Sequence, residues 1–280
     1  MQQSKRNPVL RLNLSNLRLL LGLMALALAL AACAPVVLEP EGPVATPVEE
    51  QGEVQKEEPV KENAAINSEP VVRYESMTMD DGAVIEYALA LPAGFDASQA
   101  YPVLLALPPG PQTREMVQAG LDLYWEQGAI DNGWVVVSPA SPDGTLYFRG
   151  AERYLPEFLA GIGDQVTPEG GKYHVAGISN GGISAFRLVA NHPDLVQSLL
   201  VAPGYPFSAE DRRSLLGNTD IPVAMFVGEQ DTTWIPPMQE TADALAAQGR
   251  EVSLEIVPGE GHVMRSLSSD RLFALLESFR

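Results

Sequence analysis

Cysteine and basic residues are scarce in this sequence, and each shortage excludes a class of site or partner. With a single cysteine among 280 residues, the chain can form neither an intramolecular disulfide nor a cysteine-based zinc site. Its 18 Lys and Arg face 36 Asp and Glu, for a formal net charge of −18 at pH 7. We therefore expect no nucleic-acid partner, because binding a phosphate backbone needs clustered basic residues.

Metal-ligand spacing and phosphate-binding loops are missing as well. The three histidines, taken with Asp and Glu, form no cluster with the spacing of metal ligands, and no glycine-rich loop has the phosphate-cradling pattern. We expect no metal and no other cofactor. Apolar residues, by contrast, make up 46% of the chain, which is enough for a sizeable core and excludes a wholly disordered protein.

The first 32 residues have the composition of a targeting segment rather than of a fold. Their apolar run, residues 19–30, has about the length of a signal-peptide core and ends in Leu30-Ala31-Ala32-Cys33. This tetrapeptide resembles a bacterial lipobox, in which small residues precede a cysteine. The resemblance implies that the thiol of Cys33 is diacylated and that the chain is cut just before it. The only charges in the segment precede the run, at Lys5, Arg6, Arg11 and Arg18.

A lipid on Cys33 would place the protein in the bacterial cell envelope. Two acyl chains suffice for stable anchoring, so we expect a membrane-anchored protein whose folded part lies outside the cytoplasm. Loss of residues 1–32 removes four positive charges and lowers the net charge from −18 to −22. The alternative is an uncleaved N-terminal anchor helix with an incidental cysteine.

Residues 33–70 are predicted to be the lipidated cysteine and a linker. Residues 34–70 contain nine Glu, two Lys and six Pro but no aromatic residue, a mixture that repels itself and stays extended. We expect this segment to hold the domain away from the membrane, with a partner-binding segment as the alternative. Residues 71–280 then form one domain.

From residue 71 onward, strand patterns alternate with helix patterns. Residues 71–74 and 83–87 alternate in polarity around Asp81-Gly82 and predict a β-hairpin. Apolar runs suited to parallel strands buried on both faces follow, at 103–107, 134–137, 175–178, 199–202, 223–227 and 254–257. Helical patterns separate them, at 114–127, 154–162, 182–190, 238–247 and 270–279. This order predicts an α/β fold with a doubly wound, mostly parallel sheet flanked by helices.

A G-x-S-x-G motif lies between a predicted strand and a predicted helix. Strand residues 173–176 lead into Gly177-Ile178-Ser179-Asn180-Gly181, the pattern of a nucleophile elbow. Such a turn strains the backbone of its serine and exposes the hydroxyl, while the two glycines let strand and helix approach closely. The motif alone is weak, because a serine at this position is also an ordinary turn or helix N-cap residue.

In this context, residues 71–280 resemble the α/β-hydrolase fold, and within it the compact esterase and depolymerase-like branch. The resemblance implies an acid after the second strand beyond the serine and a histidine after the last strand. Residues 221–227 are followed by Gly228-Glu229-Gln230-Asp231, and residues 252–257 by Pro258-Gly259-Glu260-Gly261-His262. The chain order Ser179, Asp231, His262 is the order of this fold.

These three residue types suit acyl transfer. A serine hydroxyl is a weak nucleophile until a base takes its proton, and imidazole side chains titrate near neutral pH. We assign the base to His262, because His174 lies inside a strand and His192 closes a helix; the alternative is an ordinary loop histidine. We assign the orienting acid to Asp231, with Glu229 as its competitor.

The predicted oxyanion hole is where the chain departs from the resemblance. One donor is expected to be the backbone N–H of Asn180, the residue after the nucleophile. The second should come from the loop after 103–107, where relatives often have His-Gly and this chain has Pro108-Pro109-Gly110-Pro111-Gln112. Proline has no N–H, so Gly110 or Gln112 must donate, and alignment with the family pattern favours Gly110. A rigid proline turn with no catalytic role is the alternative.

The sequence says less about the substrate pocket. Residues 204–220 lie where many relatives insert a lid, but the stretch is too short for a cap domain. We expect no cap domain and an open site that suits short-chain, aryl or polymeric esters. Tyr147, Tyr205 and Trp234 are candidates to line it, with ordinary packing as the alternative.

Together these patterns favour a serine hydrolase that cleaves a small-molecule or polymeric carboxylic ester through an acyl-enzyme. A peptidase or thioesterase with the same triad is a second hypothesis, although peptidases of the prolyl-oligopeptidase type usually carry a large extra domain. A catalytically inactive binding protein of the envelope is a third.

Overall fold

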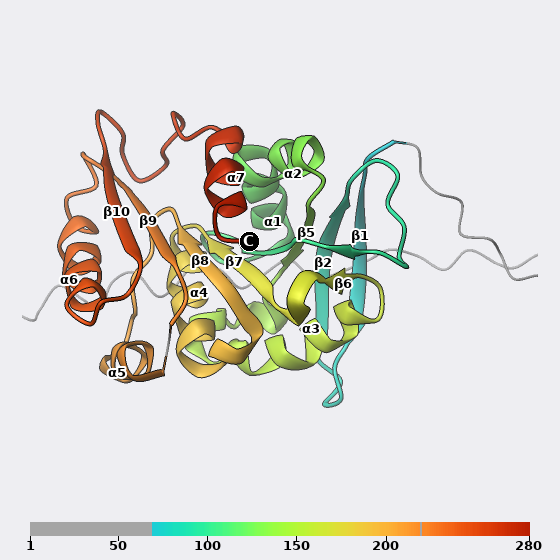
Figure 1. Cartoon of the computed structure of the whole chain (residues 1–280). Helices are drawn as coiled ribbons and strands as arrows, with labels where there is room; N and C mark the ends of the chain where they lie inside the picture. Colours follow the sequence, from blue (N-terminus) through green and yellow to red (C-terminus); the bar gives the residue numbers. More distant parts are fainter. Residues whose placement is uncertain (1–68, 219) are drawn as a thin grey trace, which may run out of the picture. The chain divides into compact units, whose positions relative to one another are not determined.

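The computed structural model describes residues 69–218 and 220–280. Cys33, the predicted signal peptide and all but the last two residues of the predicted linker lie outside the described residues. The described part forms an eight-stranded sheet in the order β1-β2-β5-β4-β7-β8-β9-β10, with helices on both faces (Figure 1). Within residues 69–218 and 220–280, no helix is long and apolar enough to cross a membrane.

The sheet is parallel apart from a hairpin at one edge. β1 pairs antiparallel with β2, β2 pairs antiparallel with β5, and the remaining neighbours are parallel. The predicted hairpin and all six apolar runs form strands of this sheet, so the predicted doubly wound α/β fold is confirmed. The strands are β1 Val71–Thr78, β2 Val84–Leu91, β4 Val103–Leu107, β5 Val135–Pro139, β7 Tyr173–Gly177, β8 Val196–Val201, β9 Val223–Gly228 and β10 Val252–Val257, with a separate parallel pair of β3 Ala100–Tyr101 and β6 Thr167–Pro168.

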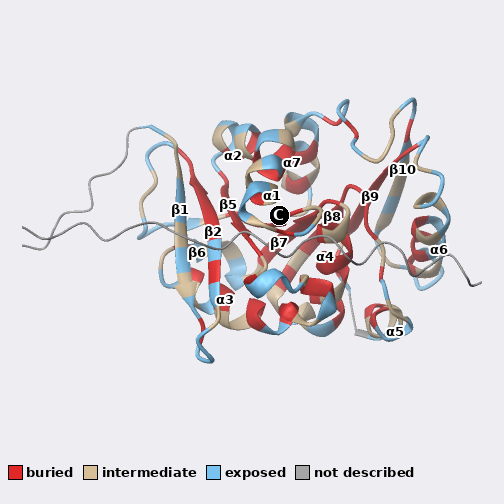
Figure 2. Ribbon diagram, turned by 180° about the vertical axis from the view of Figure 1, so that it is seen from behind, coloured by how far each residue is buried: buried red, intermediate tan, exposed pale blue. Residues whose placement is uncertain are grey.

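Alternate side chains of each central strand fill a separate core on each face of the sheet. In β4, Leu105 and Leu107 join the core that includes α3 to α6, while Leu104 and Ala106 join the core that includes α1, α2 and α7. Figure 2 shows the central strands buried. A strand in this position must be apolar throughout, which explains the unbroken apolar runs. The helices are α1 Arg114–Gly120, α2 Glu126–Asn132, α3 Leu155–Gly163, α4 Asn180–Asn191, α5 Ala209–Asn218, α6 Ile235–Ala246 and α7 Ser269–Glu277.

Three elements differ from the sequence-based expectation. The helix predicted over 114–127 continues to Asn132 and contains a π-helical turn, Leu121–Trp125, between α1 and α2. β10 is partly exposed rather than buried on both faces, because it forms an edge of the sheet. Residues 204–220 contain a helix, α5, which packs along α4 through an Arg187–Asp211 ion pair of 2.9 Å. This helix flanks the sheet, and the described residues of this stretch form no cap domain.

His174 is buried in β7, the strand that leads to the G-x-S-x-G motif. Its Nδ1 lies 2.7 Å from the Oγ of Ser198 on β8, and its ring packs against Trp134 with centroids 4.8 Å apart. Burial lowers the pKa of His174 from 6.5 to about 4, and the positive charge of Arg280 acts in the same direction. The residue is part of the core packing between strands.

Acidification should therefore destabilise the protein through His174. In the unfolded chain this imidazole takes up a proton near pH 6.5, but in the folded chain only near pH 4, so its stabilising contribution is complete above pH 6.5 and is lost between these values. Between pH 7.5 and pH 5 we expect the wild type to lose about 2 kcal/mol more unfolding free energy than His174→Gln. Urea denaturation at both pH values measures the difference, and equal losses in the two proteins would contradict it.

Candidate active site

The candidate nucleophile and the candidate oxyanion loop meet at the centre of the sheet. β4 and β7 are neighbours, but the chain continues from β4 to β5 on one side and from β7 to β8 on the other. The carboxyl ends of strands at such a reversal are where open α/β sheets place their ligand sites. Ser179 follows β7 and Gly110 follows β4, so both lie at this point.

Ser179 holds a backbone conformation that residues with side chains rarely adopt. Its φ is 57° and its ψ is −118°, and its N–H donates to the carbonyl oxygen of Pro203 at 2.9 Å. A Cβ added to Gly181 would lie 2.0 Å from the carbonyl oxygen of Leu107. The start of α4 therefore touches the end of β4 backbone to backbone, which only glycine permits.

A hydrogen-bonded chain joins the three predicted triad residues. The Oγ of Ser179 lies 2.8 Å from Nε2 of His262, and Nδ1 of the same ring lies 2.6 Å from Oδ2 of Asp231. With Nδ1–H donating to the carboxylate, Nε2 is left to accept from the serine hydroxyl. The side chain of Asp231 is 10% exposed and that of His262 is 39% exposed, so the acid is shielded while the imidazole is accessible from solvent.

Asp231 reaches the histidine, and Glu229 does not. The Oε2 of Glu229 instead accepts from the N–H of Gly259 at 2.9 Å, which ties the loop after β9 to the loop after β10. A Cβ added to Gly228 would lie 2.1 Å from the carbonyl oxygen of Gly261. The two loops therefore also touch backbone to backbone, and together these contacts fix the distance between the acid and the base.

A buried tyrosine anchors the far end of the histidine loop. The hydroxyl of Tyr124 donates to the carbonyl oxygen of Met264 at 2.8 Å and accepts from the N–H of Met264 at 3.2 Å. Burial raises the pKa of Tyr124 to about 12, so the hydroxyl keeps its proton. Tyr124 lies in the π-helical turn, a type of turn that is frequent at functional sites. The sequence placed Tyr124 only within the predicted helix 114–127.

The loop after β4 leaves Gly110 as the second candidate oxyanion donor. The N–H groups of Asn180 and Gly110 have no hydrogen-bond acceptor within the described part of the chain. The N–H of Gln112 instead closes a turn by donating to the carbonyl oxygen of Pro109 at 3.0 Å. Gly110 has a φ of 56° in that turn, and its carbonyl oxygen accepts from the side-chain amide of Asn180 at 2.8 Å.

Gln112 has a positioning role that the sequence did not reveal. Its buried Nε2 donates to the Oγ of Ser184 at 3.1 Å, and its Oε1 accepts from the N–H of Tyr147 at 2.8 Å. Ser184 in turn donates to the carbonyl oxygen of Asn180 at 2.8 Å. This network ties the loop after β4 to the first turns of α4. Its members are separated along the chain by up to 72 residues, so no local pattern marks it.

Of the three predicted lining aromatics, one packs against the triad histidine and a second packs against the first. The ring of Trp234 lies 4.9 Å from that of His262 and 5.1 Å from that of Tyr205, and both aromatic side chains are half-buried. Tyr147 is fully buried, and its hydroxyl donates to the carbonyl oxygen of Ala140 at 2.8 Å. Tyr147 thus belongs to the core and does not line the site.

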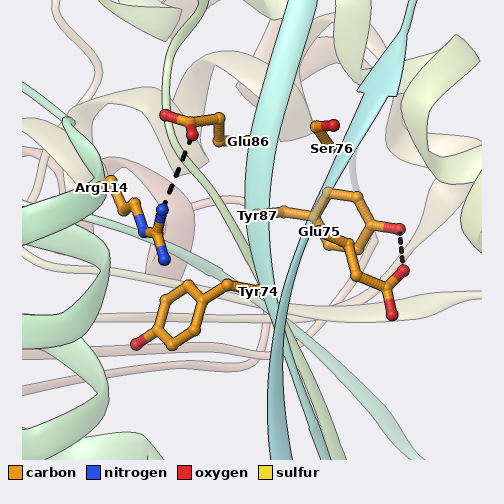
Figure 3. A pocket seen from close by; sticks show the side chains of 6 residues that line it. All are labelled: Tyr74, Glu75, Ser76, Glu86, Tyr87 and Arg114. Carbon is orange, nitrogen blue, oxygen red and sulfur yellow. Dashed lines mark hydrogen bonds and ion pairs between the residues drawn. The ribbon is translucent and has the colours of Figure 1, made fainter. Parts of the chain in front are cut away.

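A hollow of about 170 Å³ lies away from the triad, at the β1–β2 edge of the sheet (Figure 3). The guanidinium of Arg114 lies 3.8 Å from Glu86 and over the ring of Tyr74, while Tyr87 donates to Glu75 at 2.8 Å. The charged groups that line the hollow are thus already paired with their neighbours. We do not consider it a candidate active site.

Comparison with known proteins identifies the fold. No family model matches the chain. S-formylglutathione hydrolase from Agrobacterium tumefaciens is similar to it with a TM-score of 0.62 at 17% identity, over 76% of this chain and 95% of that one. A thermostable esterase is similar with a TM-score of 0.61 at 14% identity, over 74% of this chain and 62% of that one. The feruloyl esterase module of Clostridium thermocellum is similar with a TM-score of 0.57 at 17% identity, over 73% of this chain and 87% of that one. Together with the strand order, these similarities show that the chain has the α/β-hydrolase fold.

Proposed function

We propose that this chain is a serine hydrolase that cleaves carboxylic esters through an acyl-enzyme intermediate. The observation that carries the proposal is the hydrogen-bonded chain from Ser179 through His262 to Asp231, which begins on a strained turn. The similarity in fold to two esterases and a further hydrolase supports it. The proposed reaction needs no cofactor.

In acylation, the Oγ of Ser179 attacks the carbonyl carbon of the ester while Nε2 of His262 takes the hydroxyl proton. The carbonyl oxygen becomes an oxyanion, which the N–H groups of Asn180 and Gly110 stabilise. The intermediate collapses when His262 passes its proton to the departing alcohol oxygen, and the acyl group remains on Ser179. Asp231 stabilises the imidazolium that forms between these two proton transfers.

Deacylation repeats these steps with water as the nucleophile. His262 takes a proton from the water, the resulting hydroxide attacks the acyl carbonyl carbon, and Ser179 leaves with the proton that His262 returns. The 39% exposure of the His262 side chain gives water access to the base. Without a cap domain, the site suits short-chain or aryl esters and ester units within a polymer.

Ser179→Ala should remove the nucleophile and leave the domain folded. We expect kcat for 4-nitrophenyl butyrate to fall by at least about 10⁴-fold, because the remaining groups can only bind and polarise the ester. The circular dichroism spectrum should not change. A fluorophosphonate should give one adduct by mass spectrometry, on Ser179, and none in His262→Ala.

Two outcomes would overturn the proposal, the first from fluorophosphonate labelling and the second from assays with further substrates. A folded wild type that takes up no fluorophosphonate would instead be a catalytically inactive binding protein. Turnover of aminoacyl 4-nitroanilides or thioesters without turnover of 4-nitrophenyl esters would make the enzyme a peptidase or a thioesterase with the same triad.

Asp231→Asn should slow ester hydrolysis by stabilising the wrong imidazole tautomer. An amide that donates to Nδ1 leaves the proton on Nε2, which then cannot accept from Ser179. We expect kcat to fall by about 10³–10⁴-fold. Glu229→Gln is the matched control, because it removes the same charge two residues away while its amide oxygen can still accept from the N–H of Gly259. It should keep kcat within about threefold. Similar losses in both variants would refute the assignment of the acid to Asp231.

We also propose that Cys33 carries a lipid that anchors the protein to a bacterial membrane, with the folded domain outside the cytoplasm. The support comes from the sequence: a signal-peptide-like run ends in a lipobox-like tetrapeptide, and an acidic, proline-rich segment follows it. A lipid anchor would keep the hydrolase beside the membrane, and the extended segment would let it reach substrates away from the surface.

Cys33→Ser should abolish both lipid attachment and cleavage. We expect the wild type to incorporate radiolabelled palmitate and to lose residues 1–32, as judged by the mass of the purified protein. The Cys33→Ser protein should stay unlabelled and keep those residues, while Ala34→Ser, one residue away, should behave as the wild type. An unlabelled wild type that retains residues 1–32 would point to an uncleaved anchor helix.

A further inference from the structure

An arginine lies over two phenylalanine rings near the candidate active site. The guanidinium of Arg149 is 5.3 Å from the centre of the Phe148 ring and 5.7 Å from that of Phe207. The two rings contact each other with centroids 5.1 Å apart. Phe148 is buried, but Phe207 is 51% exposed, which makes it one of the most exposed large apolar side chains among the described residues. We call these three residues the Arg149 cluster.

One route from the triad to the Arg149 cluster runs along α4. The N–H of Phe148 donates to the Oγ of Ser184 at 3.2 Å. The same hydroxyl donates at 2.8 Å to the carbonyl oxygen of Asn180, which directly follows the nucleophile. The backbone of Phe148 is therefore attached to α4 one helical turn beyond Asn180.

A second route from the triad runs through the loop after β8. The ring of Trp234 lies 4.9 Å from the ring of His262, and the ring of Tyr205 lies 5.1 Å from that of Trp234. Phe207 follows Tyr205 by two residues and packs against Phe148. The loop after β8 thus carries one ring, Tyr205, beside Trp234 and a second, Phe207, in the Arg149 cluster. We call Trp234, Tyr205 and Phe207 the aromatic wall.

Arg149 is not paired with a carboxylate in the part of the chain that the structure describes. Its side chain is exposed and forms neither an ion pair nor a hydrogen bond with any described residue, although the chain has twice as many acidic as basic residues. Arg187 on α4, by contrast, pairs with both Glu152 and Asp211. A guanidinium whose face lies on aromatic rings keeps its N–H edge free, and this edge binds a carboxylate through two parallel hydrogen bonds.

We propose that the Arg149 cluster is a substrate subsite for an ester that carries a carboxylate. The inference rests on the proposed esterase function and adds the class of substrate. The aromatic wall would hold the apolar part of the ester, and Arg149 would bind the carboxylate at a distance from the reacting carbonyl carbon. Because the acidic surface repels anions in general, this arginine supplies the attraction that selects such a substrate.

Two pairs of substrates test the proposal, one for each side of the ester bond. On the acyl side, 4-nitrophenyl hydrogen adipate is compared with its methyl ester. On the alcohol side, the butyrate ester of 4-hydroxybenzoate is compared with that of methyl 4-hydroxybenzoate. We expect Arg149→Gln to lower the charged-to-neutral ratio of kcat/KM by about tenfold for one pair, as for loss of a charge-assisted hydrogen bond at an exposed site.

Arg213→Gln is the matched control. Arg213 on α5 is also exposed and forms no ion pair within the described residues, so its loss changes the net charge equally and should keep both ratios within about twofold. Phe207→Ala, which removes the exposed ring, should lower the same ratio as Arg149→Gln. Ratios that are equal in wild type and Arg149→Gln for both pairs would overturn the subsite. A wild type that hydrolyses none of the four esters would overturn the proposed function itself.

Discussion

The backbone conformation of Ser179 is the constraint on which the rest of the site depends. A φ of 57° at a serine costs on the order of 1–3 kcal/mol, and it persists because the neighbouring backbone leaves no alternative. The carbonyl oxygen of Pro203, beyond β8, holds the N–H of Ser179, and Gly181 lies against the carbonyl oxygen of Leu107 at the end of β4. The serine is therefore held by three adjacent central strands, β4, β7 and β8, and its position is set by the buried centre of the sheet.

The proposed base and acid, His262 and Asp231, follow strands at the edge of the sheet rather than at its buried centre. β9 and β10 lie at one edge of the sheet, and β10 is partly exposed. The loops that follow them are held to each other by backbone contact and by the bond from Gly259 to Glu229, and Tyr124 fastens the end of the histidine loop to the helical layer. This arrangement keeps the side chain of Asp231 shielded and leaves His262, the proposed general base, open to solvent.

The Arg149 cluster favours an anionic ligand, whereas the net charge of the protein disfavours one. With a formal charge of −18, the long-range field of the protein opposes anions. The single guanidinium on the Phe148 and Phe207 rings acts only at contact distance, where hydrogen-bond geometry outweighs a screened field. Selection of a carboxylate would therefore come from a short-range contact and not from electrostatic steering.

The sequence by itself determined the order of strands and helices and the chain order of Ser179, Asp231 and His262. Both are local signals, because a strand buried on both faces is apolar at every position and the elbow needs glycine beside its serine. The sequence favoured Asp231 over Glu229 and Gly110 over Gln112 but left both alternatives open. Only the tertiary structure shows that Asp231 contacts His262 while Glu229 does not, and that the N–H of Gln112 is engaged in a turn. The members of each pair lie two residues apart on one loop, so their contacts depend on the path of the folded loop. The same holds for the Gln112–Ser184 network, the anchor of Tyr124 on Met264 and the approach of Phe207 to Phe148. Each joins residues tens of positions apart, and such contacts leave no periodic pattern in the chain.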